Sequence, residues 1–234
     1  MNGKIVFITG GTSGYGKAMA KRFAQEGARV IIAARKQEEL DAVSREIGCD
    51  ALRMDVTDFA AWHSARAYVE EKYGRLDVLI NNAGGGVAIK PVAEQTKVEI
   101  DRAILLNLNS VIYAANTFAP LFMAQRAGTI LNMSSVCARQ CWPEWSVYAA
   151  AKAGVLNFSK GLYTELQPYG VRVSCIIPAA AATGFHKAAH MDSIKAALQP
   201  EDIADTAVYI ASLPDRAVVE EVTVWGVDQV VSPL

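Results

Sequence analysis

The chain has 234 residues, of which 52% are hydrophobic and 20% are charged, and its formal net charge at pH 7 is −1. This balance is typical of a soluble globular protein and excludes a disordered or fibrous chain. A near-neutral charge without a clustered basic stripe gives no electrostatic case for nucleic-acid binding. The length predicts one α/β domain that spans residues 1–234.

The N-terminal segment and the cysteines indicate in which cellular compartment the protein is expected. Residues 1–11 contain an apolar run that is too short for a secretory signal or a membrane span, so we expect a cytoplasmic protein without a membrane partner. The four cysteines, which show no metal-ligand spacing with the histidines, are Cys49, Cys137, Cys141 and Cys175. We expect reduced thiols and no metal.

Short β-branched runs alternate along the chain with longer segments of helical periodicity. Seven strands are predicted, at residues 4–9, 28–34, 51–56, 76–81, 128–134, 171–177 and 220–226. Helices are expected to begin near Gly14, Glu38, Asp58, Lys97, Trp145 and Pro200. The alternation predicts a parallel sheet, and the near-continuous apolar strands predict burial on both faces. The expected fold is a three-layer, doubly wound α/β fold with a seven-stranded parallel sheet, which binds ligands beyond the carboxyl ends of its strands.

A glycine-rich segment, TGGTSGYGKA, follows directly after the first predicted strand. Such a turn lets backbone amides approach a pyrophosphate while the next helix directs its N-terminus at the charge. Its spacing, T-G-x-x-x-G-x-G, differs from the general dinucleotide fingerprint G-x-G-x-x-G. A glycine-rich turn with a packing role only is the alternative. The candidate cofactor contacts in this segment are Gly10, Thr12, Ser13, Gly14, Tyr15 and Gly16.

The end of the second predicted strand bears on the choice of nucleotide. An acidic residue there would bind the ribose hydroxyls of NAD(H) and repel a 2′-phosphate. The strand ends instead in Ala33, Ala34, Arg35 and Lys36. Because a guanidinium forms forked hydrogen bonds to phosphate, Arg35 favours NADP(H) over NAD(H). Alternatively, Arg35 and Lys36 only begin a solvated helix, whose acidic residues are Glu38 and Glu39.

Tyr148 lies four residues before Lys152, which places both side chains on one helix face, one turn apart. Either they are unrelated surface groups or the ammonium changes the chemistry of the phenol. A free phenol titrates near pH ~10, and a nearby positive charge lowers that pKa. On the second interpretation, Tyr148 would act as a general acid and base.

The glycine loop, NNAG at 81–84, a serine at 135 and YAAAK at 148–152 together resemble the short-chain dehydrogenase/reductase family over nearly the whole chain. The resemblance implies a Rossmann fold and an NADP(H)-dependent enzyme that interconverts a carbonyl and an alcohol by hydride transfer. It places the catalytic tetrad on Asn107, Ser135, Tyr148 and Lys152. Ser135 is preferred to Ser134 because it lies thirteen residues before Tyr148.

The resemblance also assigns a role to each member of the tetrad. Tyr148 exchanges the proton, while Lys152 lowers its pKa and binds the ribose of the nicotinamide half. Ser135 donates to the substrate oxygen, and Asn107 holds a water near Lys152. Asn107 is preferred to Asn109 because Pro120 follows at the family's usual distance.

Further cofactor contacts follow from the same resemblance. They are Asp55, Val56, Asn82, Ala83, Gly84, Pro178, Ala181 and Thr183, together with Tyr148 and Lys152. The family usually has Pro-Gly at the end of the sixth strand, whereas Ala179 follows Pro178 here. Because alanine tolerates positive φ less well than glycine, the path of this loop and the contact of Thr183 with the carboxamide are left open.

The substrate pocket is expected to involve residues 85–91, 136–145 and 179–199. Ser135 and Tyr148 would hold the carbonyl, Arg139 would pair with a carboxylate or sulfonate, and Trp142 would form a wall. An exposed arginine and a tryptophan at a subunit contact are the alternative. Residues 198–214 resemble the subgroup that acts on small 3-hydroxy acids.

Two other functions are compatible with parts of this pattern. A nucleotide-sensing protein of the same fold usually lacks part of the tetrad, which is complete here. A sugar-nucleotide epimerase or dehydratase shares the Tyr/Lys pair but usually has an extra C-terminal domain. The family resemblance also implies a homodimer or homotetramer.

Overall fold

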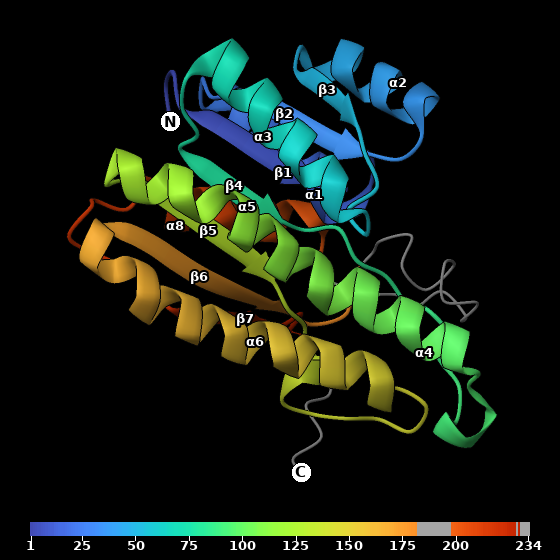
Figure 1. Cartoon of the computed structure of the whole chain (residues 1–234). Helices are drawn as coiled ribbons and strands as arrows, with labels where there is room; N and C mark the ends of the chain where they lie inside the picture. The colour runs from blue at the N-terminus through green and yellow to red at the C-terminus, as the bar shows by residue number, and fades with distance from the viewer. Residues whose placement is uncertain (182–197, 228, 230–234) are drawn as a thin grey trace.

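The computed structural model describes residues 1–181, 198–227 and 229. Within them, seven strands form one parallel sheet in the order β3-β2-β1-β4-β5-β6-β7 (Figure 1). The strands are β1 (Ile5–Thr9), β2 (Arg29–Ala34), β3 (Asp50–Arg53), β4 (Val78–Asn81), β5 (Gly128–Met133), β6 (Val171–Pro178) and β7 (Glu221–Val224). The predicted α/β fold with a seven-stranded parallel sheet is confirmed.

Helices connect the strands and begin close to the predicted positions. The α-helices are α1 (Gly14–Gln25), α2 (Gln37–Ile47), α3 (Phe59–Tyr73), α4 (Lys97–Ile104), α5 (Ser110–Gln125), α6 (Ser146–Leu166) and α8 (Pro200–Ser212). Short 3₁₀ turns are η1 (Val92–Glu94), η3 (Val136–Ala138) and η4 (Gln167–Tyr169). Local capping explains some of the boundaries: Thr96 and Glu99 form a capping box at the start of α4.

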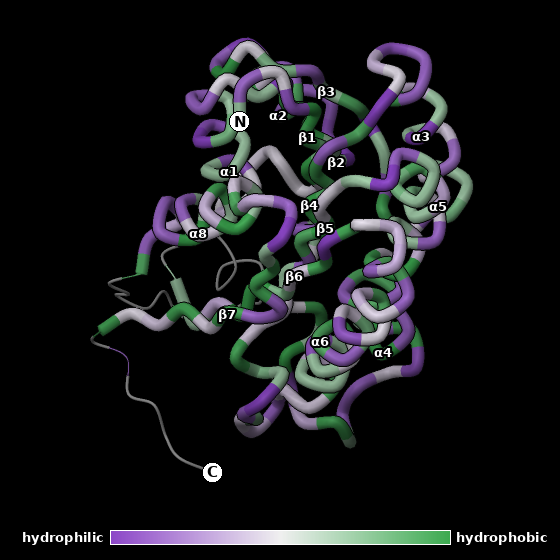
Figure 2. The backbone as a smooth tube through the Cα atoms, turned by 90° about the vertical axis from the view of Figure 1, so that its left-hand side faces the viewer, coloured by the Kyte–Doolittle hydropathy of each residue, from purple (hydrophilic) through white to green (hydrophobic). Residues whose placement is uncertain are grey.

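The sheet is covered on both faces, as its apolar strands require. Along β1, Val6 and Ile8 pack into a core with α1, α2 and α8, whereas Ile5 and Phe7 pack into a second core with α3, α5 and α6. Figure 2 shows these helices on opposite sides of the strands. Successive side chains of a strand point to opposite faces of the sheet, so each buried strand contacts helices on both faces. The result is a three-layer fold.

Helices α4 and α5 are joined without a break by a π-helical turn, η2 (Leu105–Asn109). The combined stretch, Lys97–Gln125, is 29 residues long and meets the length and hydropathy criteria for a membrane span. However, Phe118 and Phe122 of α5 are fully buried in the second core. Packing against the sheet therefore accounts for part of this apolar composition, since 44% of the apolar window is buried.

The order of the strands determines where the site lies. β1 pairs with β2 on one side and with β4 on the other, so the chain reverses its winding direction between β1 and β4. The loops leaving the carboxyl ends of two neighbouring parallel strands then diverge to opposite faces and leave a crevice. In this protein the loops after β1, β4, β5 and β6 meet there.

Candidate active site

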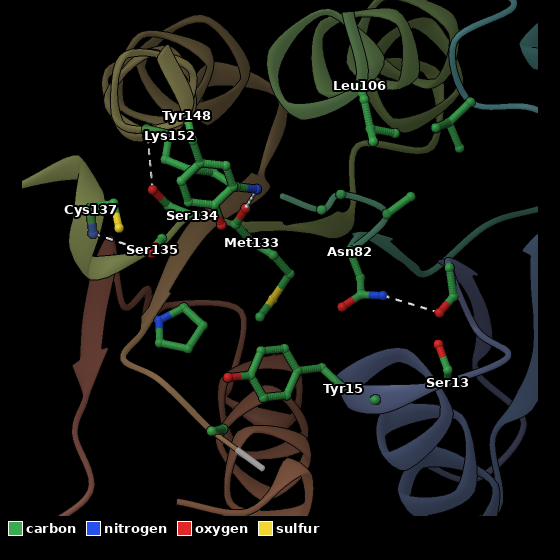
Figure 3. Close-up of a pocket in the computed structure, with 18 of the residues that line it drawn as sticks. Ser13, Tyr15, Asn82, Leu106, Met133, Ser134, Ser135, Cys137, Tyr148 and Lys152 are labelled. Carbon is green, nitrogen blue, oxygen red and sulfur yellow. Dashed lines mark hydrogen bonds between the residues drawn. The ribbon is translucent and has the colours of Figure 1, made fainter. Parts of the chain in front are cut away.

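A cavity of about 1240 Å³ extends across the carboxyl ends of the strands. Figure 3 shows its central part, where side chains from the loops after β1, β4 and β5 and from α6 converge. Its described lining comprises Gly10, residues 12–15, 33–36, 54–56, 82–85, 133–137 and 178–181, and Glu39, Leu106, Trp142, Trp145, Tyr148, Lys152, Trp225 and Gln229. The volume exceeds the range of about 300–1,000 Å³ that is usual for ligand pockets, so the cavity has room for a dinucleotide and a second small molecule.

The glycine loop (residues 10–16) is shaped for a close backbone approach. Gly10 and Gly14 have φ values of +66° and +49°, which glycine adopts without strain. A Cβ on Gly16 would lie 2.1 Å from the carbonyl oxygen of Gly10, so only glycine lets α1 pack this closely. Ser13 makes no side-chain capping bond at the start of α1. The N-terminus of α1 therefore faces the cavity as an anion site suited to a pyrophosphate.

The predicted nucleotide-selecting residues, Arg35 and Lys36, line the cavity beyond β2. The structure adds Glu39, which also lines it. The Glu39 carboxylate accepts hydrogen bonds from Lys36 Nζ at 2.7 Å and from Thr12 Oγ1 at 3.3 Å, and the contact with Lys36 lowers its pKa. The sequence shows that Lys36 and Glu39 are three residues apart, but it does not show that Thr12 also contacts Glu39. Arg35, Lys36 and Thr12 fit a 2′-phosphate, with Glu39 as a counter-charge beside them.

The predicted floor of the site is also in place. Asn82 Nδ2 donates to the carbonyl oxygen of Thr9 at 2.8 Å, and Thr9 Oγ1 accepts from the backbone amides of Asn82 and Ala83, each at 3.0 Å. These bonds fasten the loop after β4 to the end of β1. Asp55 and Val56 line the neighbouring part of the cavity after β3. The structure therefore brings these cofactor candidates to one surface.

Three members of the expected tetrad meet at the centre of the cavity (Figure 3). Tyr148 and Lys152 are buried on α6, and Ser135 lies at the end of β5. Lys152 Nζ donates to the carbonyl oxygen of Met133 at 3.0 Å and lies 5.7 Å from the centroid of the Tyr148 ring. Ser134 Oγ instead donates to the backbone oxygen of Lys152 at 2.8 Å. Ser134 therefore binds the backbone of α6, and Ser135 is the serine whose side chain is the candidate for substrate binding in the cavity.

Asn107 lies in the π-helical turn and is fully buried, outside the cavity lining. Its Oδ1 accepts from the amide of Gly85, and its Nδ2 donates to the carbonyl oxygens of Gly85 and Ala103, each at 3.0 Å. A Cβ on Gly84 would lie 2.9 Å from Asn107 Oδ1 and 3.3 Å from Lys152 Nζ. Asn107 thus positions the loop after β4 beside Lys152; the water it was expected to hold stays a prediction.

The pKa of Tyr148 at the centre of the cavity is raised, whereas the sequence predicted that Lys152 would lower it. Burial raises the pKa of the Tyr148 phenol, although hydrogen bonding to Ser135 opposes this in part. Burial also lowers the pKa of Lys152 to about 8. Because Lys152 donates to Met133 and burial disfavours both charged forms, the expected lowering of the Tyr148 pKa by Lys152 does not dominate in this structure.

Two predictions about the substrate end have different outcomes. Trp142 lines the cavity, as expected. Arg139 does not line it: its guanidinium pairs with Glu221 and donates to Thr223 Oγ1 at 3.0 Å, both on β7. The prediction that Arg139 binds a substrate carboxylate is therefore corrected. Trp145, which lies in the predicted segment 136–145, also lines this end. Trp225 lines it too and was missed, because the sequence does not indicate which way a tryptophan faces.

The end of β6 follows a regular path despite its unusual sequence. The Ala179 amide donates to the carbonyl oxygen of Val224 at 2.9 Å, which extends the pairing with β7, and Ala179 has no positive φ. Tyr15 Oη donates to the carbonyl oxygen of Ala179 at 3.3 Å, linking the glycine loop to this strand. Pro178 and Ala181 line the cavity. Thr183, the predicted carboxamide contact, lies outside the described residues.

Comparison with known proteins agrees with this geometry. A model of the short chain dehydrogenase family matches residues 4–193. An uncharacterized oxidoreductase of Staphylococcus aureus (strain N315) is 31% identical over 224 residues, covering 94% of this chain and 96% of the relative. A metagenomic short-chain oxidoreductase in complex with NADP has a TM-score of 0.85 at 31% identity, covering 96% of this chain and 97% of the other.

The closed form of a serine dehydrogenase complexed with NADP⁺ has a TM-score of 0.91 at 28% identity and covers 98% of both chains. The family match over residues 4–193 includes the glycine loop and the helix that carries Tyr148 and Lys152. The chain belongs to the short-chain dehydrogenase/reductase family and is an oxidoreductase of that family.

Proposed function

We propose that the protein is an NADP(H)-dependent oxidoreductase that interconverts an aldehyde, ketone or keto acid and the corresponding alcohol. One observation carries the proposal: the buried phenol of Tyr148 lies in the cavity with Ser135 and Lys152, beyond the strand ends where the fold binds nucleotides. Structural neighbours with bound NADP support the choice of cofactor.

The residues that would hold the cofactor form a continuous track through the cavity. The glycine loop and the N-terminus of α1 would hold the pyrophosphate, and Arg35 and Lys36 would bind the 2′-phosphate. Asp55 and Val56 would bracket the adenine, and the loop after β4 would support the nicotinamide half. When bound, the cofactor supplies or accepts the hydride.

The protein's own residues then handle the proton and the orientation of the substrate. Burial keeps Tyr148 protonated, which suits a phenol that donates its proton to the carbonyl oxygen during reduction. Ser135 would donate a second hydrogen bond to the same oxygen and fix its position. Lys152 would bind the nicotinamide ribose and, as an ammonium, would favour the phenolate that remains on Tyr148.

A narrower function, oxidation of a small 3-hydroxy acid, is favoured by the similarity to a serine dehydrogenase at 28% identity. It requires a cation for the substrate carboxylate. Arg139, the candidate that the sequence offered, is paired with Glu221 outside the cavity. We therefore keep the broader carbonyl and alcohol chemistry as the proposed function.

The test is Tyr148→Phe, which removes one hydroxyl and keeps the ring. We expect kcat for NADPH-dependent reduction to fall by about 10²- to 10⁴-fold, while the Kd for NADPH, measured by fluorescence titration, changes little. Reduction at the wild-type rate by the variant would contradict the role of the phenol. Tight NADPH binding by the wild-type protein without turnover of any aldehyde, ketone or keto acid would instead favour an NADP(H)-sensing protein of the same fold.

We propose a cytoplasmic homodimer or homotetramer that acts on a small molecule and binds neither nucleic acid nor membrane. Light scattering coupled to size-exclusion chromatography measures the assembly; a monomer at micromolar concentration would contradict it.

A further inference from the structure

The catalytic end of the cavity is lined by most of the protein's tryptophans. Of the four in the chain, Trp142, Trp145 and Trp225 line the cavity, and we call these three the tryptophan wall. The fourth, Trp62, is buried in the core, where its indole nitrogen donates to the Val56 carbonyl oxygen at 3.0 Å. Each residue of the wall is only partly buried, and part of its surface faces the cavity.

The tryptophan wall adjoins the reacting group. The Trp145 ring packs edge-on against the Tyr148 ring, with centroids 5.6 Å apart and an interplanar angle of 77°. Trp142 packs on the same small cluster, which comprises Cys137, Tyr148 and Ala149. A carbonyl held by the Tyr148 hydroxyl therefore has its substituents beside indole rings.

The backbone between two of these tryptophans is a strained turn. The Trp145 amide donates to the Trp142 carbonyl oxygen at 3.2 Å, with Pro143 in the second position and Glu144 in the third at φ +76°. This is the arrangement of a type II turn, whose third position favours glycine. A glutamate there costs free energy, and strain of this kind is typical of functional segments. The turn holds Trp142 and Trp145 at its two ends.

The described lining near Tyr148 carries little charge. Within the described lining, Lys152 is the single charged side chain near Tyr148, and its ammonium already donates to Met133. Arg35, Lys36, Glu39 and Asp55 belong to the opposite, nucleotide end of the cavity. From this described lining, a substrate carboxylate would lose its hydration and meet no cation other than Lys152, which already donates to Met133, and a substrate cation would meet the same ammonium.

We infer that the substrate is an uncharged aryl aldehyde or ketone, whose aromatic ring packs against the tryptophan wall while Tyr148 binds its carbonyl oxygen. The inference rests on the proposed oxidoreductase function. In the reducing direction the carbonyl carbon gains a hydride and the oxygen gains the Tyr148 proton, so one NADPH is oxidised to NADP⁺ for each alcohol formed. The resulting phenolate regains a proton from solvent.

Four probes of similar size separate the candidate substrate classes: benzaldehyde, 4-carboxybenzaldehyde, 4-(trimethylammonio)benzaldehyde and cyclohexanecarbaldehyde. We expect kcat/KM for benzaldehyde to exceed that of each charged analogue by about tenfold or more, and that of the saturated aldehyde by about three- to tenfold. Equal or higher kcat/KM for 4-carboxybenzaldehyde, or faster NADP⁺-dependent oxidation of serine than of benzyl alcohol, would overturn the inference.

The variant Trp142→Leu tests the tryptophan wall directly. We expect KM for benzaldehyde to rise by about three- to tenfold, with kcat and the Kd for NADPH little changed and a smaller rise in KM for cyclohexanecarbaldehyde. Tyr209→Leu is the matched control, because Tyr209 is 61% exposed on α8 and does not line the cavity. The same rise in KM for both aldehydes would contradict ring packing.

A binding measurement distinguishes failure of this inference from failure of the proposed function. Calorimetric titration of the Tyr148→Phe–NADP⁺ complex compares benzaldehyde with 4-carboxybenzaldehyde without turnover. Preferred binding of benzaldehyde, even if no probe is reduced by the wild-type protein, would support the aromatic pocket and count against the oxidoreductase. Preferred binding of the carboxylate would overturn the inference and leave the oxidoreductase function intact.

Discussion

Lys152 is a buried amine whose pKa is lowered by its surroundings. Burial lowers its pKa from 10.5 to about 8. Between these values the unfolded chain binds more protons than the folded one, so the contribution of Lys152 to stability rises as pH rises through this window. It is complete above pH 10.5 and lost as pH falls through about 8.

We therefore predict that the free energy of unfolding of the wild type, relative to Lys152→Met, rises by about 1 kcal/mol between pH 7 and pH 9. Urea unfolding of both proteins at the two pH values measures the difference. Taking the difference is necessary because burial raises the pKa of Cys175, whose titration acts in the opposite direction. A pH-independent difference would show that Lys152 titrates normally.

Glu39 places a negative charge at the end of the cavity that is suited to a 2′-phosphate. Its carboxylate accepts hydrogen bonds from Lys36 and Thr12, so a phosphate must compete with it for these donors. We predict that Glu39→Gln tightens NADP⁺ binding by about two- to fivefold, the size expected of one exposed ion pair. The Kd for NAD⁺ should not change.

Fluorescence titration with both nucleotides measures this preference. Glu38→Gln is the matched control, since Glu38 is the exposed neighbour on α2 and does not line the cavity. Equal effects of the two substitutions on NADP⁺ affinity would show that only the net charge of the helix matters. Weaker NADP⁺ binding in Glu39→Gln would show that Glu39 instead orders the phosphate site.

At the residue scale, the sequence predicted the site residues whose relation depends only on their spacing along the chain. Tyr148 and Lys152 share a helix face, and the glycine loop follows β1 directly, so both were visible along the chain. Arg139 was misassigned because Glu221, its partner, lies 82 residues later, on the neighbouring β7. Glu39 was missed because its importance depends on Thr12, which the fold brings to it from another loop.

Among the structural elements, the turn from Trp142 to Trp145 contains Glu144, one of three non-glycine residues with positive φ in the described part of the chain, beside Ala88 and Arg126. Glu144 is exposed, so its backbone conformation at φ +76° matters more here than its side chain. We predict that Glu144→Gly keeps the preference for benzaldehyde over cyclohexanecarbaldehyde, whereas Glu144→Val loses most of it because a β-branched residue resists this conformation. Steady-state kinetics with the two aldehydes gives the ratio, and equal ratios in both variants would rule out a role for the turn geometry.

The elements themselves differ in how well the sequence predicts them. The seven strands were found because apolar β-branched runs stand between turn residues, although β3 ends at Arg53 rather than at residue 56. The π-helical turn Leu105–Asn109 was not predicted, since its sequence has ordinary helical composition. The extra residue of a π turn is seen only in the backbone, and here it accompanies the buried Asn107 that holds the loop after β4.

At the scale of the whole molecule, the cavity belongs to no single element. Its described lining comes from the segments that follow all seven strands, from the π-helical turn and from α6, on both sides of the reversal between β1 and β4. Sequence periodicity predicted the layers and the edge at which ligands bind, but not the closeness of loops that lie more than a hundred residues apart. Tyr15 and Ala179, joined by a hydrogen bond across 164 positions, are an example.

A site assembled in this way disappears on unfolding, so a bound nucleotide stabilises the folded chain only. At a concentration 100 times its Kd, NADP⁺ should add about 2.7 kcal/mol, which for this chain length raises Tm by about 5–10 °C. Differential scanning fluorimetry with equal concentrations of NADP⁺ and NAD⁺ should give the larger shift for NADP⁺. In Arg35→Ala the two shifts should become equal, because the guanidinium that faces the 2′-phosphate is gone. A larger shift for NAD⁺ in the wild type would contradict the assigned cofactor preference, and an undiminished NADP⁺ advantage in Arg35→Ala would move that preference to Lys36 and Thr12.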